Sequence, residues 1–164
     1  ALTSDTVADR RLGSQSCNDG GESASSTCAT IGIATDSSGR LYIADSGNNR
    51  VLELDSPLAV NQAARVFGQA SFSGGTTLFH DECNNGGISA SSLCLRRVTL
   101  LPNGNGTFTE AAAVALDSSG RLYVADTQNH RIMMWNRIPT SNHAAAGTGT
   151  TSPGRTAQAY THCS

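Results

Sequence analysis

The segment DSSGRLYIAD, residues 36–45, returns as DSSGRLYVAD at residues 117–126, and nine of the ten letters are identical. In both copies the DSSG turn is followed by a segment in which apolar and polar residues alternate, which is typical of a half-buried strand. A second polar turn and a second alternating segment, RVLELD or RIMMWN, come next. The repeat therefore predicts short antiparallel strands joined by tight turns.

A second repeat stands ahead of the first one. CNDGGESASSTC, residues 17–28, returns as CNNGGISASSLC at residues 83–94, with an offset of 66 residues instead of 81. An insertion at residues 96–110 of the second unit accounts for the difference of 15. The period is therefore 66 residues, and a segment bounded by two cysteines begins each unit.

Each unit holds three or four predicted strands. In the first unit they are IGIATD, RLYIAD, RVLELD and, after a polar link, ARVFGQ at residues 64–69. The second unit repeats the first three, but the stretch after residue 137 gives only a weak strand signal. TVADRRLGS, residues 6–14, aligns with the fourth strand and precedes the first complete unit. Four short antiparallel strands per repeat indicate β-propeller blades, so we predict an all-β chain with two four-stranded blades of an incomplete propeller.

This pattern divides the chain into four parts. They are an N-terminal segment with a blade-completing strand (1–16), a cysteine loop with the first blade (17–82), a second cysteine loop with the insertion and the second blade (83–137), and a tail rich in Gly, Ser and Thr (138–164).

Composition and charge exclude two classes of partner. The net charge is −2 and the eleven basic residues, all arginine, are scattered, so no nucleic-acid surface is expected. No apolar run reaches the 18 or so residues that a membrane span needs. The chain begins with Ala1, which fits either removal of a signal peptide or a piece of a longer protein.

The cysteines predict two disulfides. Ten residues, including two glycines, separate Cys17 from Cys28 and Cys83 from Cys94, so each loop can bend back and close. Metal ligation is the alternative, although the close cysteine spacing of zinc sites is absent. Disulfides imply an extracellular or cell-surface location. Cys163 is left over, and it pairs between chains, stays free, or lacks a partner that truncation removed.

An aspartate and an arginine recur around the second turn of each unit. Asp45 and Asp126 each stand five residues before an arginine. We interpret them as a structural latch between two strands, because a catalytic pair is needed only once, whereas this pair occurs in both units. The predicted latch residues are Asp45, Asn49, Arg50, Asp126, Asn129 and Arg131.

These residues carry a family resemblance. GRLYIADSGNNRVLELD and GRLYVADTQNHRIMMW resemble NHL repeats, with the pattern G-x-L-Y-V-A-D-x-x-N-x-R-V, and the FGQ and CNxGGxSASSxC pieces resemble a long, cysteine-containing variety in bacterial secreted and surface proteins. The resemblance covers residues 6–137. It implies a β-propeller, usually of six blades, that serves mostly as a binding scaffold; a minority of members, such as the peptidyl-amidating lyases, are metal-dependent enzymes.

Other candidate sites are weaker. His80, Asp81, Glu82 and Cys83 are adjacent, but sequence neighbours rarely converge on one metal ion, so we predict no metal, no cofactor and no catalytic residue. Asn105 begins an N-glycosylation sequon inside the insertion.

Two blades cannot close a ring, and this shortage leads to the functional prediction. The chain is a fragment of a longer propeller, or three copies form a six-bladed ring, or copies join into a filament. We predict a non-enzymatic extracellular module that self-associates head to tail, with a terminal strand of one copy completing the last blade of the next. The alternatives are a ligand- or protein-binding fragment of a longer propeller and a metal-dependent lyase or hydrolase; other extracellular proteins and glycans are further candidate partners. The predicted assembly strand is Val7, Ala8, Asp9, Arg10, Arg11 and Leu12.

Overall fold

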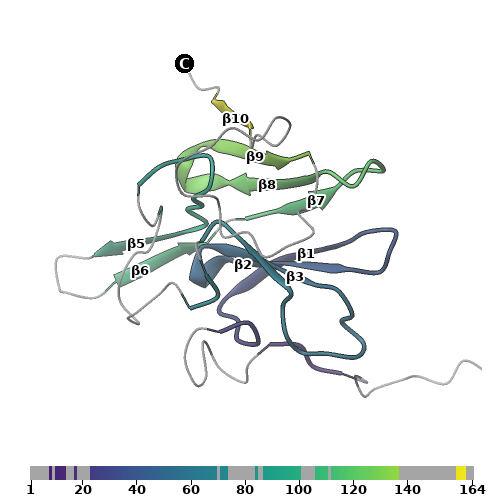
Figure 1. Ribbon diagram of the computed structural model, residues 1–164. Helices are drawn as coiled ribbons and strands as arrows, with labels where there is room; N and C mark the ends of the chain where they lie inside the picture. Colours follow the sequence, from purple (N-terminus) through teal and green to yellow (C-terminus); the bar gives the residue numbers. More distant parts are fainter. Residues whose placement is uncertain are drawn as a thin grey trace, which may run out of the picture.

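The first sheet is the first predicted blade (Figure 1). Its four strands are antiparallel and lie in the order of the sequence. A 3-10 turn, η1 (Ser46–Asn48), joins the second strand to the third and ends at Asn49, whose φ is 52°. The strands are β1 (Thr30–Thr35), β2 (Leu41–Asp45), β3 (Arg50–Leu54) and β4 (Arg65–Phe67).

The second sheet repeats this plan, and the all-β prediction of two antiparallel blades is confirmed. A second 3-10 turn, η2 (Thr127–Asn129), ends at His130 with a φ of 53°, the same left-handed conformation as at Asn49. The strands are β7 (Val114–Leu116), β8 (Leu122–Asp126), β9 (Arg131–Trp135) and β10 (Gln158–Thr161). The computed structural model describes residues 8, 10–13, 17, 23–69, 71–73, 84, 87–100, 106–110, 112–136 and 158–161.

The fourth strand of the second blade comes from the tail, where the sequence analysis found no convincing strand. β10 pairs with β9, and Tyr160 lies opposite Ile132 as Phe67 lies opposite Val51 in the first blade. The strand is only four residues long and is separated from β9 by residues 136–157, so its periodic signal was too short to recognise.

The N-terminal segment was predicted as a strand, and its described residues are not one. Ala8 and residues 10–13 have no strand conformation, and the edge of the last blade, which this segment was expected to complete, is occupied by β10. The segment lies on the first blade instead: Arg10 Nη1 donates to the Leu58 carbonyl (3.1 Å) and the Gly13 N–H donates to Asn61 Oδ1 (2.9 Å). Val7 and Asp9 lie outside the described residues.

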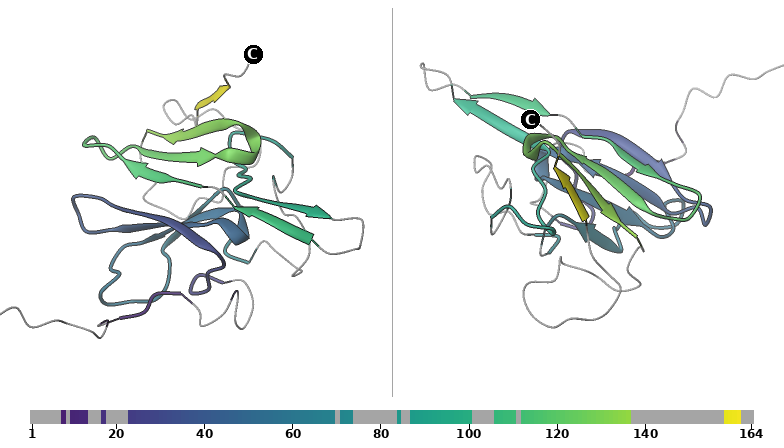
Figure 2. Two further views of the ribbon diagram at one scale, coloured as in Figure 1. Left: turned by 180° about the vertical axis from the view of Figure 1, so that it is seen from behind. Right: turned by 90° about the horizontal axis from the view of Figure 1, so that it is seen from above.

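The insertion forms a hairpin of its own. β5 (Arg96–Leu100) pairs with β6 (Gly106–Glu110) in a two-stranded antiparallel sheet. Figure 2 shows the two blades stacked on each other and the hairpin projecting beyond them. The sequon residue Asn105 lies between these strands, outside the described residues.

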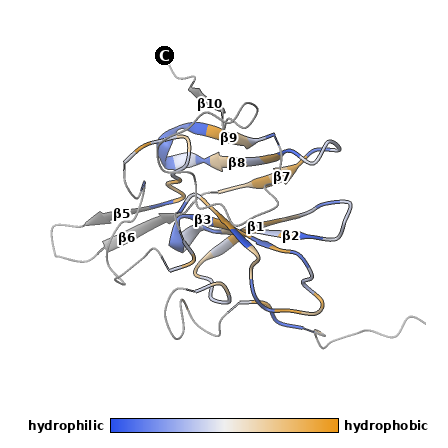
Figure 3. Ribbon diagram, viewed as in Figure 1, coloured by the Kyte–Doolittle hydropathy of each residue, from blue (hydrophilic) through white to orange (hydrophobic). Residues whose placement is uncertain are grey.

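Hydrophobic residues pack on both faces of the first blade. β1 and β7, the first strands of the two blades, lie side by side. A cluster between the blades includes Tyr42 and Val51 from the first blade and Leu122, Val124 and Met133 from the second. The opposite face of the first blade carries a second cluster, and Figure 3 shows hydrophobic and hydrophilic residues mixed along the strands of both sheets. This second cluster contains Ile43, Leu52, Leu54, Ala63 and Val66, with Leu12, Ala24, Leu41 and Phe72 against it.

In the part of the chain that the structure describes, no helix has the length and apolar character needed to cross a membrane.

Candidate functional site

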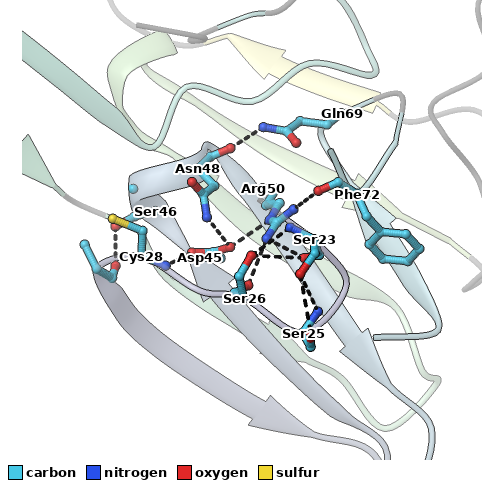
Figure 4. A network of polar contacts seen from close by, with 12 residues as sticks. Ser23, Ser25, Ser26, Cys28, Asp45, Ser46, Asn48, Arg50, Gln69 and Phe72 are labelled. Carbon is cyan, nitrogen blue, oxygen red and sulfur yellow. Dashed lines mark hydrogen bonds and ion pairs between the residues drawn. The ribbon is translucent and has the colours of Figure 1, made fainter. Parts of the chain in front are cut away.

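The first latch is a buried ion pair where β2 ends and β3 begins (Figure 4). Arg50 Nε lies 2.7 Å from Asp45 Oδ2, and both side chains are 0% exposed. Asn48 Nδ2 donates to the same carboxylate oxygen (2.8 Å). The backbone N–H of Cys28 donates to Asp45 Oδ1 at 2.6 Å, so the carboxylate also holds the end of the cysteine loop.

The arginine of this latch reaches further into the cysteine loop. Arg50 Nη2 donates to the carbonyls of Ser23 (3.0 Å) and Ser26 (2.9 Å). Arg50 Nη1 donates to the Phe72 carbonyl, which follows β4 in the chain. One guanidinium therefore joins the blade to segments on both sides of it, which suits its five rigidly arranged donors.

The second latch repeats this arrangement. Arg131 Nε lies 2.6 Å from Asp126 Oδ2, and Asn129 Nδ2 donates to the same oxygen (2.9 Å). The Cys94 N–H donates to Asp126 Oδ1 (2.6 Å), and Arg131 Nη2 donates to the Ser92 carbonyl (2.7 Å). Each Asp–Arg pair thus fastens a cysteine loop to its own blade, where the sequence predicted only a turn between two strands.

The asparagine of the first latch is Asn48, which the sequence analysis missed. The offset of 81 residues aligns Asn48 with Asn129, and this alignment was the signal that pointed to it. Asn49 aligns with His130 and has a different role: its Oδ1 accepts the backbone N–H groups of Leu95 (2.7 Å) and Arg96 (2.8 Å). Asn49 therefore connects the first blade to the unit that follows it.

The comparison with known families agrees with this repeat. The family model described as the NHL repeat matches residues 31–54 and residues 108–132, which cover β1 to β3 and the strands from β7 to the start of β9. The chain therefore carries two NHL repeats, one in each blade. The NHL repeat is generally a non-catalytic unit of protein-interaction propellers. A search of curated proteins finds no match.

The cysteine loop of the first NHL blade is closed covalently. Cys17 and Cys28 form the predicted disulfide, with their Cα atoms 4.3 Å apart. Cys94 is disulfide-bonded as well. Cys83 and Cys163 lie outside the described residues, so the Cys83–Cys94 pairing stays a prediction.

Both carboxylate oxygens of Asp45 are engaged inside the latch. Burial raises the pKa of Asp45, while Arg50, the Cys28 N–H and Asn48 act in the opposite direction. Its two oxygens accept three hydrogen bonds from these groups and are shielded from solvent. A carboxylate enclosed in this way has no route to a substrate, and its geometry fits the predicted structural latch.

A second group of charges lies inside the contact between the blades. Glu53 is 0% exposed and its Oε1 lies 2.6 Å from Arg65 Nη1 and 3.4 Å from Arg40 Nη1. Burial raises the pKa of Glu53 to about 7, although both arginines lower it. The hydroxyl of Tyr42, buried on the same face, has no hydrogen-bond partner among the described residues. The first blade therefore carries a titratable group where the equivalent residue of the second blade is Met134.

The N-terminal segment lies where the outer strand of a preceding blade would lie. The alignment of the two segments places Leu12 at the position of Phe67 and Gly13 at that of Gly68. Gly13 and Gly68 have similar φ values, 87° and 90°. Gly13 lies close to Thr27 and Gly68 lies close to Leu93, and these two neighbours are equivalent at the 66-residue offset. Leu12 packs against the cluster with Ile43 and Leu52, just as Phe67 packs between the blades. The described part of the predicted assembly strand thus has the packing of a fourth strand without the pairing.

The structure gives no metal site in the region that it describes: no three His, Cys, Asp or Glu side chains converge there. The residues His80, Asp81, Glu82 and Cys83 lie outside that region.

Proposed function

We propose that this chain is a non-catalytic, extracellular interaction module that joins copies of itself head to tail. In this arrangement residues 6–14 of one copy pair with β9 of the next copy and complete its second blade. The observation that carries the proposal is the position of the N-terminal segment on the first blade. Its Leu12 and Gly13 repeat the contacts of Phe67 and Gly68, although residues 1–16 are too few to hold the other strands of such a blade.

The exchange requires one rearrangement, because β10 occupies the edge of β9 within a single chain. The incoming segment would replace β10 and pair with β9 as β4 pairs with β3 in the first blade. Replacement of one edge strand by another adds no exposed edge, so the hydrogen bonds lost with β10 are recovered. β10 then protects the edge of β9 in the separate chain.

An extracellular setting is supported by the Cys17–Cys28 disulfide, because such bonds persist mainly in oxidising compartments. The absence of catalysis is supported by the enclosure of both latch aspartates and by the general behaviour of the family. The resemblance of the cysteine loops to those of secreted and surface proteins of bacteria also supports an extracellular setting.

A second candidate function is a protein-binding segment of a longer six-bladed NHL propeller. The same observation favours it, since the N-terminal segment would then complete the last blade of its own chain. In both the self-associating module and the longer propeller, the outer strand of one blade is far in sequence from the other strands of that blade.

Deleting residues 1–14 tests the proposal. We expect the full chain to form oligomers in sedimentation experiments and the truncated chain to lose them. A synthetic peptide of residues 1–14 should bind the truncated chain and displace β10, and a scrambled peptide of the same composition is the control. Unchanged oligomers after the deletion would exclude strand exchange, and a full chain that stays monomeric at all concentrations would exclude self-association.

A further inference from the structure

Each blade has a partly open apolar surface on the side away from the other blade; on the first blade Leu12 and Phe72 cover the cluster around Ile43 and leave the residues of β1 exposed. On the second blade Ile132 is 53% exposed, whereas its equivalent in the first blade, Val51, is 0% exposed. On the first blade Ile31 and Ile33 are 41% and 66% exposed. We call these surfaces the leading face (Ile31 and Ile33) and the trailing face (Tyr123 and Ile132).

The contact between the two blades shows what each of these faces fits. The residues equivalent to Ile31 and Ile33 are Ala112 and Val114, which are half-buried against the cluster between the blades. The residues equivalent to Tyr123 and Ile132 are Tyr42 and Val51, which that cluster buries completely. Within one chain, the surface of the second blade that corresponds to the leading face is therefore packed on the surface of the first blade that corresponds to the trailing face.

The strand registers make this equivalence specific. Ile33 lies opposite Ile43 and Val114 lies opposite Val124, so both point to the same side of their blades. Ile132 lies opposite Ala125 and Val51 lies opposite Ala44, on the other side. The two open faces are thus the two halves of an interface that the molecule already contains once.

We propose that the trailing face of one copy docks on the leading face of a second copy and repeats the internal contact between the blades. This inference rests on the proposed self-association and names the surfaces that carry it. The contact is heterologous, because two different faces meet, so it continues from copy to copy until a ring closes or a filament grows. It also brings the N-terminal segment of the second copy next to β9 of the first, where strand exchange would occur.

Two single substitutions and their mixture test the inference in the full chain. Ile33→Asp removes the leading face and Ile132→Asp removes the trailing face, and both positions are exposed, so the fold is retained. Ile88→Asp is the matched control, since Ile88 is 71% exposed and belongs to neither face. The near-ultraviolet circular dichroism of Trp135, which packs against Phe67 between the blades, reports on the fold of each variant.

We expect each of the two variants to weaken self-association by about 100-fold, since a charge buried at the centre of an interface opposes binding strongly. Ile88→Asp should associate like the unmodified chain. Ile33→Asp mixed with Ile132→Asp should form a 1:1 dimer and nothing larger, because each partner supplies one intact face. If both variants associate like the unmodified chain while that chain forms oligomers, the docking inference is wrong and the proposed function stands. If the unmodified chain never associates, both are wrong.

Discussion

The two blades share the DSSGRLY turn and strand and the Asp–Arg latch, and they differ in what covers them. The Asp–Arg latch has the same geometry in both, with ion-pair distances of 2.7 and 2.6 Å. Around the latch the exposure differs, since Arg50 is 0% exposed and Arg131 is 8% exposed. The hydroxyl of Tyr123 donates to Asp117 (3.0 Å), whereas its equivalent, Tyr42, is enclosed between the blades. Equivalent residues therefore contribute different amounts to the free energy of unfolding, because their surroundings differ.

The largest effect should follow from removing the charge of a latch. Asp45→Asn leaves the buried Arg50 guanidinium without its counter-charge, and we expect the free energy of unfolding to fall by about 3–5 kcal/mol. Asp126→Asn should lower it less, because Arg131 retains some contact with water. Urea unfolding at neutral pH measures both, with Asp55→Asn, at a half-exposed carboxylate, as the control. A greater loss in Asp126→Asn than in Asp45→Asn would contradict the comparison.

The disulfide of the first loop comes next. Replacing Cys17 and Cys28 together by serine frees the loop in the unfolded chain, and we expect a loss of about 2–3 kcal/mol in the free energy of unfolding. Hydrogen exchange should then accelerate in β2 and β3, whose latch holds this loop, and stay unchanged in β8 and β9. Equally faster hydrogen exchange in both blades would contradict the view that each cysteine loop stabilises only its own blade.

The charge between the blades should make stability depend on pH. Burial raises the pKa of Glu53 from 4.5 to about 7, so the folded state binds this proton more tightly than the unfolded state. The protonated carboxyl makes its full contribution to the unfolding free energy below pH 4.5, and this contribution, about 3 kcal/mol, is lost as the pH rises through about 7. Glu53→Gln should flatten the unfolding free energy over this range, relative to the unmodified chain. A difference between the two proteins that grows toward acid pH would have the wrong sign.

The smallest effect should come from the DSSG turns. Asp36 and Asp117 each accept backbone N–H groups two and four residues ahead and pair with an arginine at 2.5 Å. The Arg121 N–H is the main group that lowers the pKa of Asp117, to about 2. Asp36→Asn should lower the midpoint of thermal unfolding slightly and Asp117→Asn still less, because the second pair is more exposed. Both differences should shrink as the pH falls from 3.8 through about 2, because the unmodified carboxyls take up protons over this range. Differences that stay constant there would contradict this account.

The strands that alternate in sequence could be predicted, and those that depend on distant partners could not. β1 to β3 and β7 to β9 follow from period-two patterns between strong turn signals. β10 is four residues in a tail of low complexity and is defined by its partner β9. The hairpin β5–β6 went unnoticed, although the sequence between its two short strands contains PNGN, which is rich in turn-forming residues.

The latch was predictable only in part for the same reason. Asp45 and Arg50 are close in sequence and recur, so their pairing could be inferred. The N–H group of Cys28 and the carbonyls of Ser23 and Ser26 are tertiary partners, and no local pattern identifies them. Equally, no sequence pattern shows that Val51 is covered while Ile132 is 53% exposed, because this difference depends on which segments pack against each blade.

The late position of β10 in the chain affects how the second blade forms during synthesis. On a ribosome β7, β8 and β9 emerge before residues 136–157 have been added, so the edge of β9 stays unpaired for the whole of that interval. The first blade has no comparable delay, since β4 follows β3 after residues 55–64. Until β10 emerges, the edge of β9 is open to any extended segment nearby, including the N-terminal segment of a chain on a neighbouring ribosome. Translation speed over this stretch would then influence whether a chain closes on itself or pairs with another.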